Sequence, residues 1–99
     1  MTTAQIKKYY SFAVKSGATI YGTDNICRAK RVYFVLASDE LAQNAKDRLT
    51  RKAQRACCNI KILSANEFGQ IESNPAIKAI GIKNQELAKA MQLNNGDLK

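Results

Sequence analysis

Four basic residues recur at helical spacing in the middle of the chain. The positions i, i+3, i+4 and i+7 hold Arg48, Arg51, Lys52 and Arg55. A helix would place all four on one face, where like charges repel one another, so one interpretation is a ridge that binds phosphates. The other is a solvated outer face, whose cations lie near the C-terminal end of the helix and favour its dipole. The spacing alone leaves both interpretations open.

The segment 22–31 is a second candidate for contacts with a nucleic acid. Gly22 offers a turn before a helix start, where exposed backbone N–H groups can bind a phosphate. The polar side chains that follow could hold a phosphate backbone and reach a base edge. A plain glycine turn with an N-cap explains the start of the segment equally well. The polar residues of the segment are Thr23, Asp24, Asn25, Arg28, Lys30 and Arg31.

Residues suited to enzymatic chemistry are scarce. The sequence contains no histidine, which is the commonest general base and the commonest metal ligand, so neither hydrolytic nor metal chemistry is expected. Its three cysteines are Cys27, Cys57 and Cys58, an odd set whose spacing fits neither a disulfide framework nor a zinc site. We predict that they are small buried hydrophobes, with a thiol activity at Cys57 and Cys58 as the alternative. We expect that the protein has no cofactor and no enzymatic activity.

The overall charge favours a polyanionic partner. Sixteen lysines and arginines against eight aspartates and glutamates give a net charge of +8, and nine of these cations fall between residues 28 and 61. Nucleic acid is therefore the first candidate. The 99 residues, 45% of them hydrophobic, predict one ordered domain over 1–99, with a loose polar tail from 94 to 99. No apolar run suits a membrane span or a signal peptide, so a cytoplasmic protein is expected.

The elements that position these residues are organised around one buried strand. The run 32–37 is continuous, apolar and rich in β-branched and aromatic residues, which predicts a strand covered on both faces by helices. The order of elements along the chain predicts an α/β fold, with a small sheet between two layers of helices. Helices are predicted over 2–16 and 22–28, from 38 to 57, briefly from 64, and from 84 to 91. Strands are predicted over 18–21, 32–37, 60–63 and 76–82.

Capping signals mark several of these boundaries. Thr2 and Ser64 each open a capping box, Asn84 suits the N-cap of the last helix, and Gly17 suits the left-handed end of the first. The aromatic residues fall mostly at core-facing positions, so a platform for stacking bases is the less favoured use of them. They are Tyr9, Tyr10, Phe12, Tyr21, Tyr33, Phe34 and Phe68.

Several motifs, taken in order, have the arrangement of a known family. They are Ala13-Val14-Lys15-Ser16-Gly17 with Tyr21-Gly22-Thr23, then Val32-Tyr33-Phe34-Val35-Leu36-Ala37-Ser38-Asp39, and then Ala79-Ile80-Gly81-Ile82 with Glu86-Leu87-Ala88-Lys89. Over about residues 8 to 91 the chain resembles the kink-turn RNA-binding family of ribosomal proteins named after L-seven-Ae and L-thirty-e, and it is most similar to the short bacterial members. The resemblance implies a three-layer α-β-α sandwich with a mixed four-stranded sheet. It also implies a non-enzymatic protein that binds structured RNA, in the ribosome or elsewhere, and we expect a monomer without membrane contact.

The RNA signature of this family lies at the start of the second helix and reads Gly-x-Asn-Glu-x-x-Lys, with Lys-Gln replacing Asn-Glu in some members. The matching residues here are Gly22-Thr23-Asp24-Asn25-Ile26-Cys27-Arg28. Arg28 keeps the type of the family's lysine, whereas Asp24 puts a carboxylate where the family has an amide. Asn25 keeps an amide that could contact a purine edge.

The resemblance also indicates what surrounds this signature. Ser38, Asp39 and the loop 71–75 would border the RNA site, while Arg31 and the basic face of the long helix would add phosphate contacts without sequence preference. The alternative is a protein-interaction module on the same fold, whose charge serves only solubility.

Overall fold

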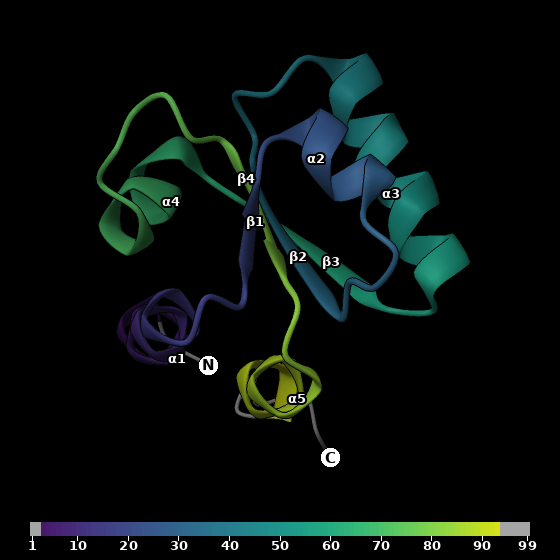
Figure 1. Ribbon diagram of the computed structural model, residues 1–99. Coiled ribbons are helices and arrows are strands. Elements are labelled where there is room, and N and C mark those ends of the chain that lie inside the picture. Colours follow the sequence, from purple (N-terminus) through teal and green to yellow (C-terminus); the bar gives the residue numbers. More distant parts are fainter. Residues whose placement is uncertain (1–2, 94–99) are drawn as a thin grey trace.

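The structure, a computed structural model, describes residues 3–93 (Figure 1). Within these residues the chain forms five helices and four strands. The helices are α1 (Thr3–Lys15), α2 (Thr23–Arg28), α3 (Gln43–Ala56), α4 (Ala65–Ile71) and α5 (Gln85–Leu93). The strands are β1 (Thr19–Tyr21), β2 (Phe34–Ser38), β3 (Asn59–Leu63) and β4 (Ala79–Ile82). None of these helices has the length and apolar content needed to cross a bilayer.

The four strands form one mixed sheet in the order β1-β4-β2-β3. Strand β4 is antiparallel to both of its neighbours, whereas β2 and β3 are parallel. Every residue of β2 and β4 is buried, as predicted for the run around which the chain is organised. Because β4 runs against the other three strands, its start lies at the same end of the sheet as the ends of β1, β2 and β3. We call this end the sheet end.

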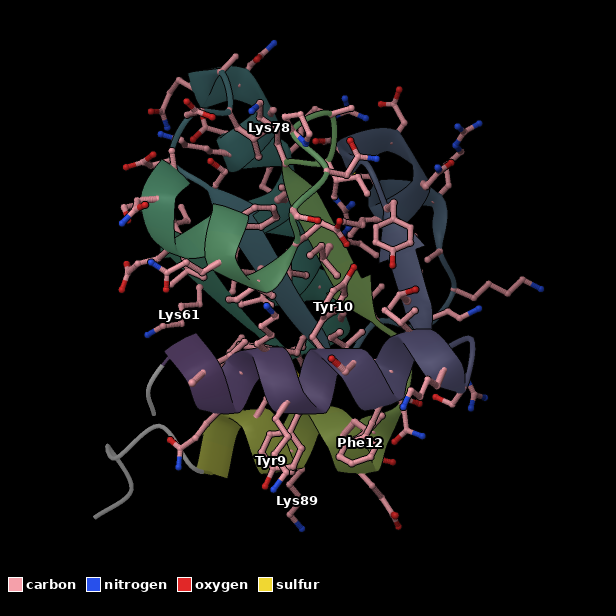
Figure 2. The ribbon with its side chains drawn as sticks, turned by 90° about the vertical axis from the view of Figure 1, so that its left-hand side faces the viewer. Tyr9, Tyr10, Phe12, Lys61, Lys78 and Lys89 are labelled. Carbon is pink, nitrogen blue, oxygen red and sulfur yellow. The ribbon has the colours of Figure 1, made fainter. Side chains whose placement is uncertain are left out.

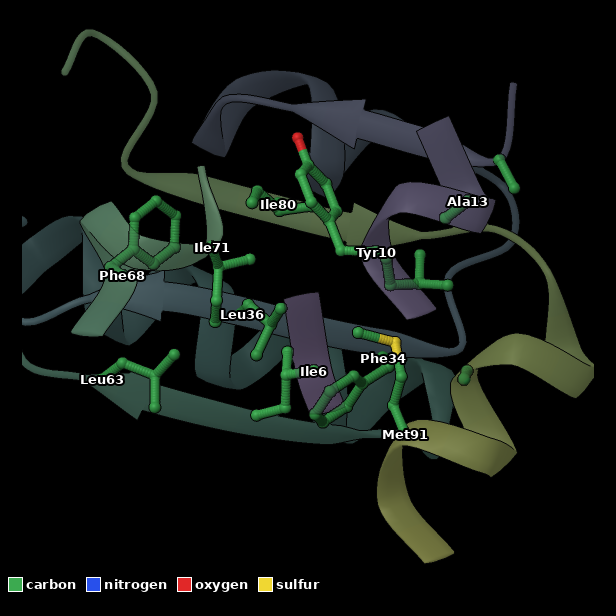
Figure 3. Packing of buried hydrophobic residues seen from close by; sticks show 13 residues of the cluster. Ile6, Tyr10, Ala13, Phe34, Leu36, Leu63, Phe68, Ile71, Ile80 and Met91 are labelled. Atoms are coloured by element: carbon green, nitrogen blue, oxygen red, sulfur yellow. The ribbon is translucent and has the colours of Figure 1, made fainter. Parts of the chain in front are cut away.

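Helices cover both faces of the sheet, which confirms the predicted three-layer sandwich. Figure 1 shows α2 and α3 on one face and α1, α4 and α5 on the other. Figure 2 looks onto the second face, where α1 lies alongside α5 and Tyr10 points towards the sheet. Apolar residues from α1, α4, α5 and the sheet form one core there, which includes Tyr10, Phe34, Phe68 and Met91 (Figure 3). Burial of such side chains contributes roughly 1.5–3 kcal/mol each.

Helix α2 is held on the sheet by one side chain. Of its six residues only Ile26 is buried, with an exposed fraction of 0%. Ile26 packs over Gly81 of β4, where a Cβ atom would stand only 3.2 Å from Ile26 Cγ1. The absence of a side chain at Gly81 therefore allows the close approach of α2 to the sheet.

Most of the predicted caps are confirmed. Gly17 follows α1 with a φ of 70°, Ser64 Oγ accepts a hydrogen bond from Glu67 N at 3.2 Å, and Asn84 Oδ1 accepts one from Leu87 N at 2.9 Å. The predicted box at Thr2 and the tail 94–99 lie outside the described residues. Local side-chain to backbone bonds of this kind depend on short sequence spacing, which explains why they could be found without the fold.

Two predicted boundaries are wrong. Helix α3 does not begin at 38–40 but at Gln43, because Ser38 remains in β2 and its hydroxyl accepts from Glu40 N at 3.2 Å, which caps a turn rather than a helix. Strand β4 begins at Ala79 rather than at 76, because Ile77 N donates to Asn74 O at 3.0 Å and closes a turn there. Long-range pairing of β2 with the chain before β4 decided the first boundary, and a local turn decided the second.

The prediction of buried cysteines is also wrong. Cys57 is exposed, since it ends α3 in the left-handed conformation with a φ of 56°, and Cys27 and Cys58 are half-buried. Partial burial raises the pKa of the Cys58 thiol and so lowers its thiolate fraction. Among the aromatic residues Phe12 is the exception to core placement, with half of its surface exposed.

These thiol environments predict an order of reaction. In the folded protein a thiol reagent at neutral pH is expected to modify Cys57 faster than Cys58, because Cys57 is accessible and the thiolate of Cys58 is disfavoured. Time-resolved mass spectrometry of the labelled protein measures the order. Faster modification of Cys58 in the wild-type protein would contradict it, and the Cys57→Ser variant identifies the fast site.

Candidate nucleic-acid interface

Three of the residues predicted to bind RNA meet at the sheet end. Gly22 N donates to Ala79 O at 3.1 Å, which places the start of α2 beside the start of β4. Ser38 N donates to Lys78 O at 2.9 Å, and Asp39 N donates to Leu63 O at 2.9 Å. The structure thus brings Gly22, Ser38 and Asp39 together from three separate parts of the sequence, as the resemblance implied.

A pocket of about 330 Å³ opens at the sheet end between β2, α4 and the loop that follows α4. Phe68 and Ile77 contribute apolar walls, and Ser38 lies almost fully buried beside them. At the rim Lys78 Nζ and Glu40 Oε1 form an ion pair at 2.8 Å. Residues 72–75 line the pocket, so the predicted bordering loop does lie next to Ser38.

The loop after α4 is fixed through Glu72. Tyr10 OH donates to Glu72 Oε1, and Glu72 Oε2 accepts from Asn74 N at 2.9 Å. The Tyr10 and Tyr21 hydroxyls are 2.8 Å apart, which connects this loop to the last residue of β1. Burial, followed by these hydrogen bonds, raises the pKa of Tyr10, so its phenol stays protonated. The pocket rim is therefore attached to α1 and β1.

The two candidate segments of the sequence meet in one ion pair. Asp24 Oδ1 of α2 and Arg48 Nη2 of α3 are 2.8 Å apart, with exposed side-chain fractions of 69% and 44%. The hydrogen bond and the charge of Asp24 raise the pKa of Arg48 above its usual value. The carboxylate that departs from the family signature thus has a cationic partner on the long helix, which sequence spacing could not show.

Asn25 and Arg28 of the signature use their side chains to donate hydrogen bonds to backbone carbonyl groups four residues earlier. Asn25 Nδ2 donates to Tyr21 O at 2.9 Å, and Arg28 Nε donates to Asp24 O at 3.4 Å. Gly22 has a φ of 91°, a conformation that favours glycine, and Thr23 is half-buried. The amide of Asn25 is therefore partly occupied before any ligand arrives.

The basic face of α3 divides into two pairs. Arg48 bonds to Asp24, and Lys52 Nζ donates to Ala29 O at 2.6 Å, so both turn towards α2. Arg51 and Arg55 are exposed, and their side chains make no hydrogen bond or ion pair within residues 3–93. Of the four cations in the predicted phosphate-binding ridge, only Arg51 and Arg55 therefore have side chains free to contact phosphates.

Arg31 does not join the sheet end. It lies at the opposite end of the sheet, where Lys30, Arg31 and Lys83 surround a shallow pocket of about 540 Å³ with Ile20 and Ala29. Lys83 was not among the residues predicted to bind RNA, because its place beside Arg31 depends on the position of β4 between β1 and β2. Because Lys52 binds Ala29 O, this second pocket adjoins the basic face of α3.

Charge differs sharply between these two regions. At the sheet end the carboxylates are Asp24, Asp39, Glu40 and Glu72, and the cations Arg48 and Lys78 are each paired with one of them. Around the second pocket the charged lining residues are all cationic, and on α3 the exposed cations Arg51 and Arg55 outnumber the one exposed carboxylate, Asp47. Phosphates are therefore attracted to α3 and the second pocket, and uncharged groups fit the sheet end better.

Comparison with known proteins supports the fold. No protein-family model matches the sequence, and no curated protein matches it. A protein of unknown function from Bacillus halodurans has a similar structure, with a TM-score of 0.78, 16% identity, and coverage of 90% of this chain and 94% of that one. The Pelota protein of Thermoplasma acidophilum is similar with a TM-score of 0.65 and 24% identity. That match covers 83% of this chain and 28% of Pelota.

Proposed function

We propose that this chain is a non-enzymatic RNA-binding protein of the L-seven-Ae and L-thirty-e family, most similar to its short bacterial ribosomal-protein-like members. The observation that carries the proposal is the contact of α2 with α3, which joins the two candidate segments into one surface. This surface runs from the sheet end along the outer side of α3 to the pocket of Lys30, Arg31 and Lys83.

In this proposal the two regions of the surface bind different parts of a structured RNA. Arg51 and Arg55, with the cations of the second pocket, contact phosphates and supply affinity without sequence preference. The sheet end, where carboxylates outnumber cations and a pocket opens beside Ser38, receives unpaired bases of a kink-turn or a similarly bent RNA. The protein acts as a monomer in the cytoplasm, where its free thiols stay reduced, either on the ribosome or on another RNA.

A titration with two RNAs tests this function. We expect a kink-turn hairpin to bind about tenfold or more tightly than a plain duplex of equal length, because one or two base contacts contribute that much and phosphate contacts are common to both. Fluorescence anisotropy at low salt measures both affinities. Equal affinities would mean that only phosphates are bound, and no binding of either RNA would contradict the proposal.

One observation favours a protein-interaction function instead. Phe12 and Val14 of α1 expose 50% and 46% of their surface, and Figure 2 shows Phe12 beside Tyr9 over α5. Val14 also lines a groove of about 690 Å³ between α1 and α4. Exposed apolar side chains are typical of docking surfaces where they join into one contiguous patch. The Phe12→Ser variant should bind the kink-turn hairpin like the wild type if RNA contacts only the surface formed by α2 and α3.

A further inference from the structure

The ion pair of Asp24 and Arg48 is not needed to hold α2 against α3. Both side chains are largely exposed, and exposed ion pairs contribute little to the stability of a fold. The two helices already share a core in which Ile26 and Leu49 are fully buried. The stability of the α2–α3 contact therefore does not account for the presence of this ion pair.

The pair changes what Arg48 can bind. A guanidinium group carries five N–H donors in a planar fork, and Asp24 Oδ1 engages one nitrogen, Nη2. Asp24 restricts the rotation of this long side chain, which lowers the entropy that a bound ligand must offset. It also neutralises the charge of Arg48, so the remaining donors attract a phosphate less strongly than a free arginine would.

Other groups at the sheet end also disfavour a phosphate as the ligand of Arg48. Asp39 and Glu40 add negative charge at the sheet end, which further disfavours a phosphate there. Asn25, the amide of the signature, donates to Tyr21 O and is less available for a base edge. An uncharged group with two adjacent acceptors suits a fixed guanidinium best, and in nucleic acids the common one is the O6 and N7 edge of guanine.

We infer that Arg48, positioned by Asp24, contacts the O6 and N7 edge of a guanine in the bound RNA. The inference rests on the proposed RNA binding, and it gives Asp24 a positive role where it departs from the family signature. Arg48 is the specificity-determining residue and Asp24 is a positioning residue. The RNA must then offer a guanine whose edge is not buried in a regular helix, where the groove is too narrow for a side chain.

Replacement of single atoms in the RNA tests this contact. The probes are a kink-turn hairpin and copies in which one loop guanine at a time is replaced by 7-deazaguanine, which has a C–H group in place of N7. We expect one replacement to weaken wild-type binding by a part of the roughly 5- to 150-fold that a whole bidentate base contact contributes, because N7 is one of its two acceptors. Arg48→Lys, which keeps the charge but not the fork, should bind the parent hairpin more weakly by a similar factor and should not respond to that replacement.

The role of Asp24 is tested with the same probes. Asp24→Asn should reduce the sensitivity to the critical 7-deazaguanine, because the guanidinium is no longer fixed, and Asp24→Glu should restore most of it. A variant with the same change of charge on the far face, Glu86→Gln, should keep the wild-type response. Circular dichroism and thermal melting show whether each variant is folded, and the exposed positions make folding failure easy to recognise.

The outcomes separate the two proposals. If the wild type binds the hairpin but every 7-deazaguanine affects wild type and Arg48→Lys equally, Arg48 contacts no guanine edge and the inference is wrong, while RNA binding stands. Equal responses of Asp24→Asn and wild type, with a loss only in Arg48→Lys, would remove the role of Asp24. If the wild type binds none of these RNAs at low salt, the proposed function and the inference fall together.

Discussion

A rise in salt from about 50 to about 200 mM is expected to weaken binding of the kink-turn hairpin about 100-fold. The exposed Arg51 and Arg55, with two of the cations around the second pocket, would contact roughly four phosphates and displace their counterions, which gives a slope of about −3.6 in a plot of log affinity against log salt. Anisotropy titrations at four or more salt concentrations measure the slope. A flat dependence would favour the protein-interaction function, in which the charge only keeps the protein in solution.

Variants of α3 test which cations contact these phosphates. Changing Arg51 and Arg55 together to Gln should reduce the slope by about two units and weaken all RNAs by a similar factor, since phosphate contacts carry no sequence information. The matched control changes Lys7 and Lys15 on α1, which lie on the opposite face of the sheet and are also exposed. If the control lowers the slope as much as the test variant, binding depends on net charge and not on the face of α3.

The replacement of Ile26 by Ala is expected to lower the free energy of unfolding by about 2–5 kcal/mol. Ile26 is the one buried side chain of α2, and Val35, Leu49 and Gly81 surround it, so its removal leaves a cavity between α2 and the sheet. RNA binding should also weaken where the variant remains folded, because α2 carries Asp24. Urea denaturation measures the stability of each variant.

The chain offers a matched control for this cavity. Ile62→Ala deletes the same atoms from an edge strand where 45% of the side chain is exposed, and it should change stability by less than about 1 kcal/mol. Similar losses in the two variants would show that α2 is not held through Ile26. The comparison also separates burial from residue type, since both residues are isoleucines.

The sequence predicts the layers of this fold better than the boundaries of its elements. The run 32–37 identified β2, because a strand buried on both faces leaves an uninterrupted apolar signal. Ser38 to Glu40 carry the composition of a helix start, yet β2 extends to Ser38 because Ser38 N bonds to Lys78 O. A partner forty residues away in the sequence decided that boundary, and local pattern contains no information about it.

For the candidate site, too, some features were predicted from the sequence and others were not. Gly22 and Ser38 were placed together by resemblance, and the hydrogen bonds to β4 confirm that they share one end of the sheet. The bond between Asp24 and Arg48 escaped prediction because residues on different helices show no common periodicity. Arg31 was assigned to the site as part of the segment 22–31, but α2 carries the chain from Gly22 at the sheet end towards the opposite end of the sheet. The two ends of this segment therefore serve different pockets.

The strand order has a consequence for the way the chain folds during synthesis. Strand β4 separates β1 from β2, so β1 has no partner strand until residues 79–82 have left the ribosome. The parallel pair of β2 and β3 with α3 across it can form earlier, since its contacts span a shorter stretch of chain. A nascent chain that ends before 79 is therefore expected to hold a half-built sheet with β2 open along one edge. Such an edge can pair with other chains, which makes the interval before β4 emerges the step most exposed to aggregation.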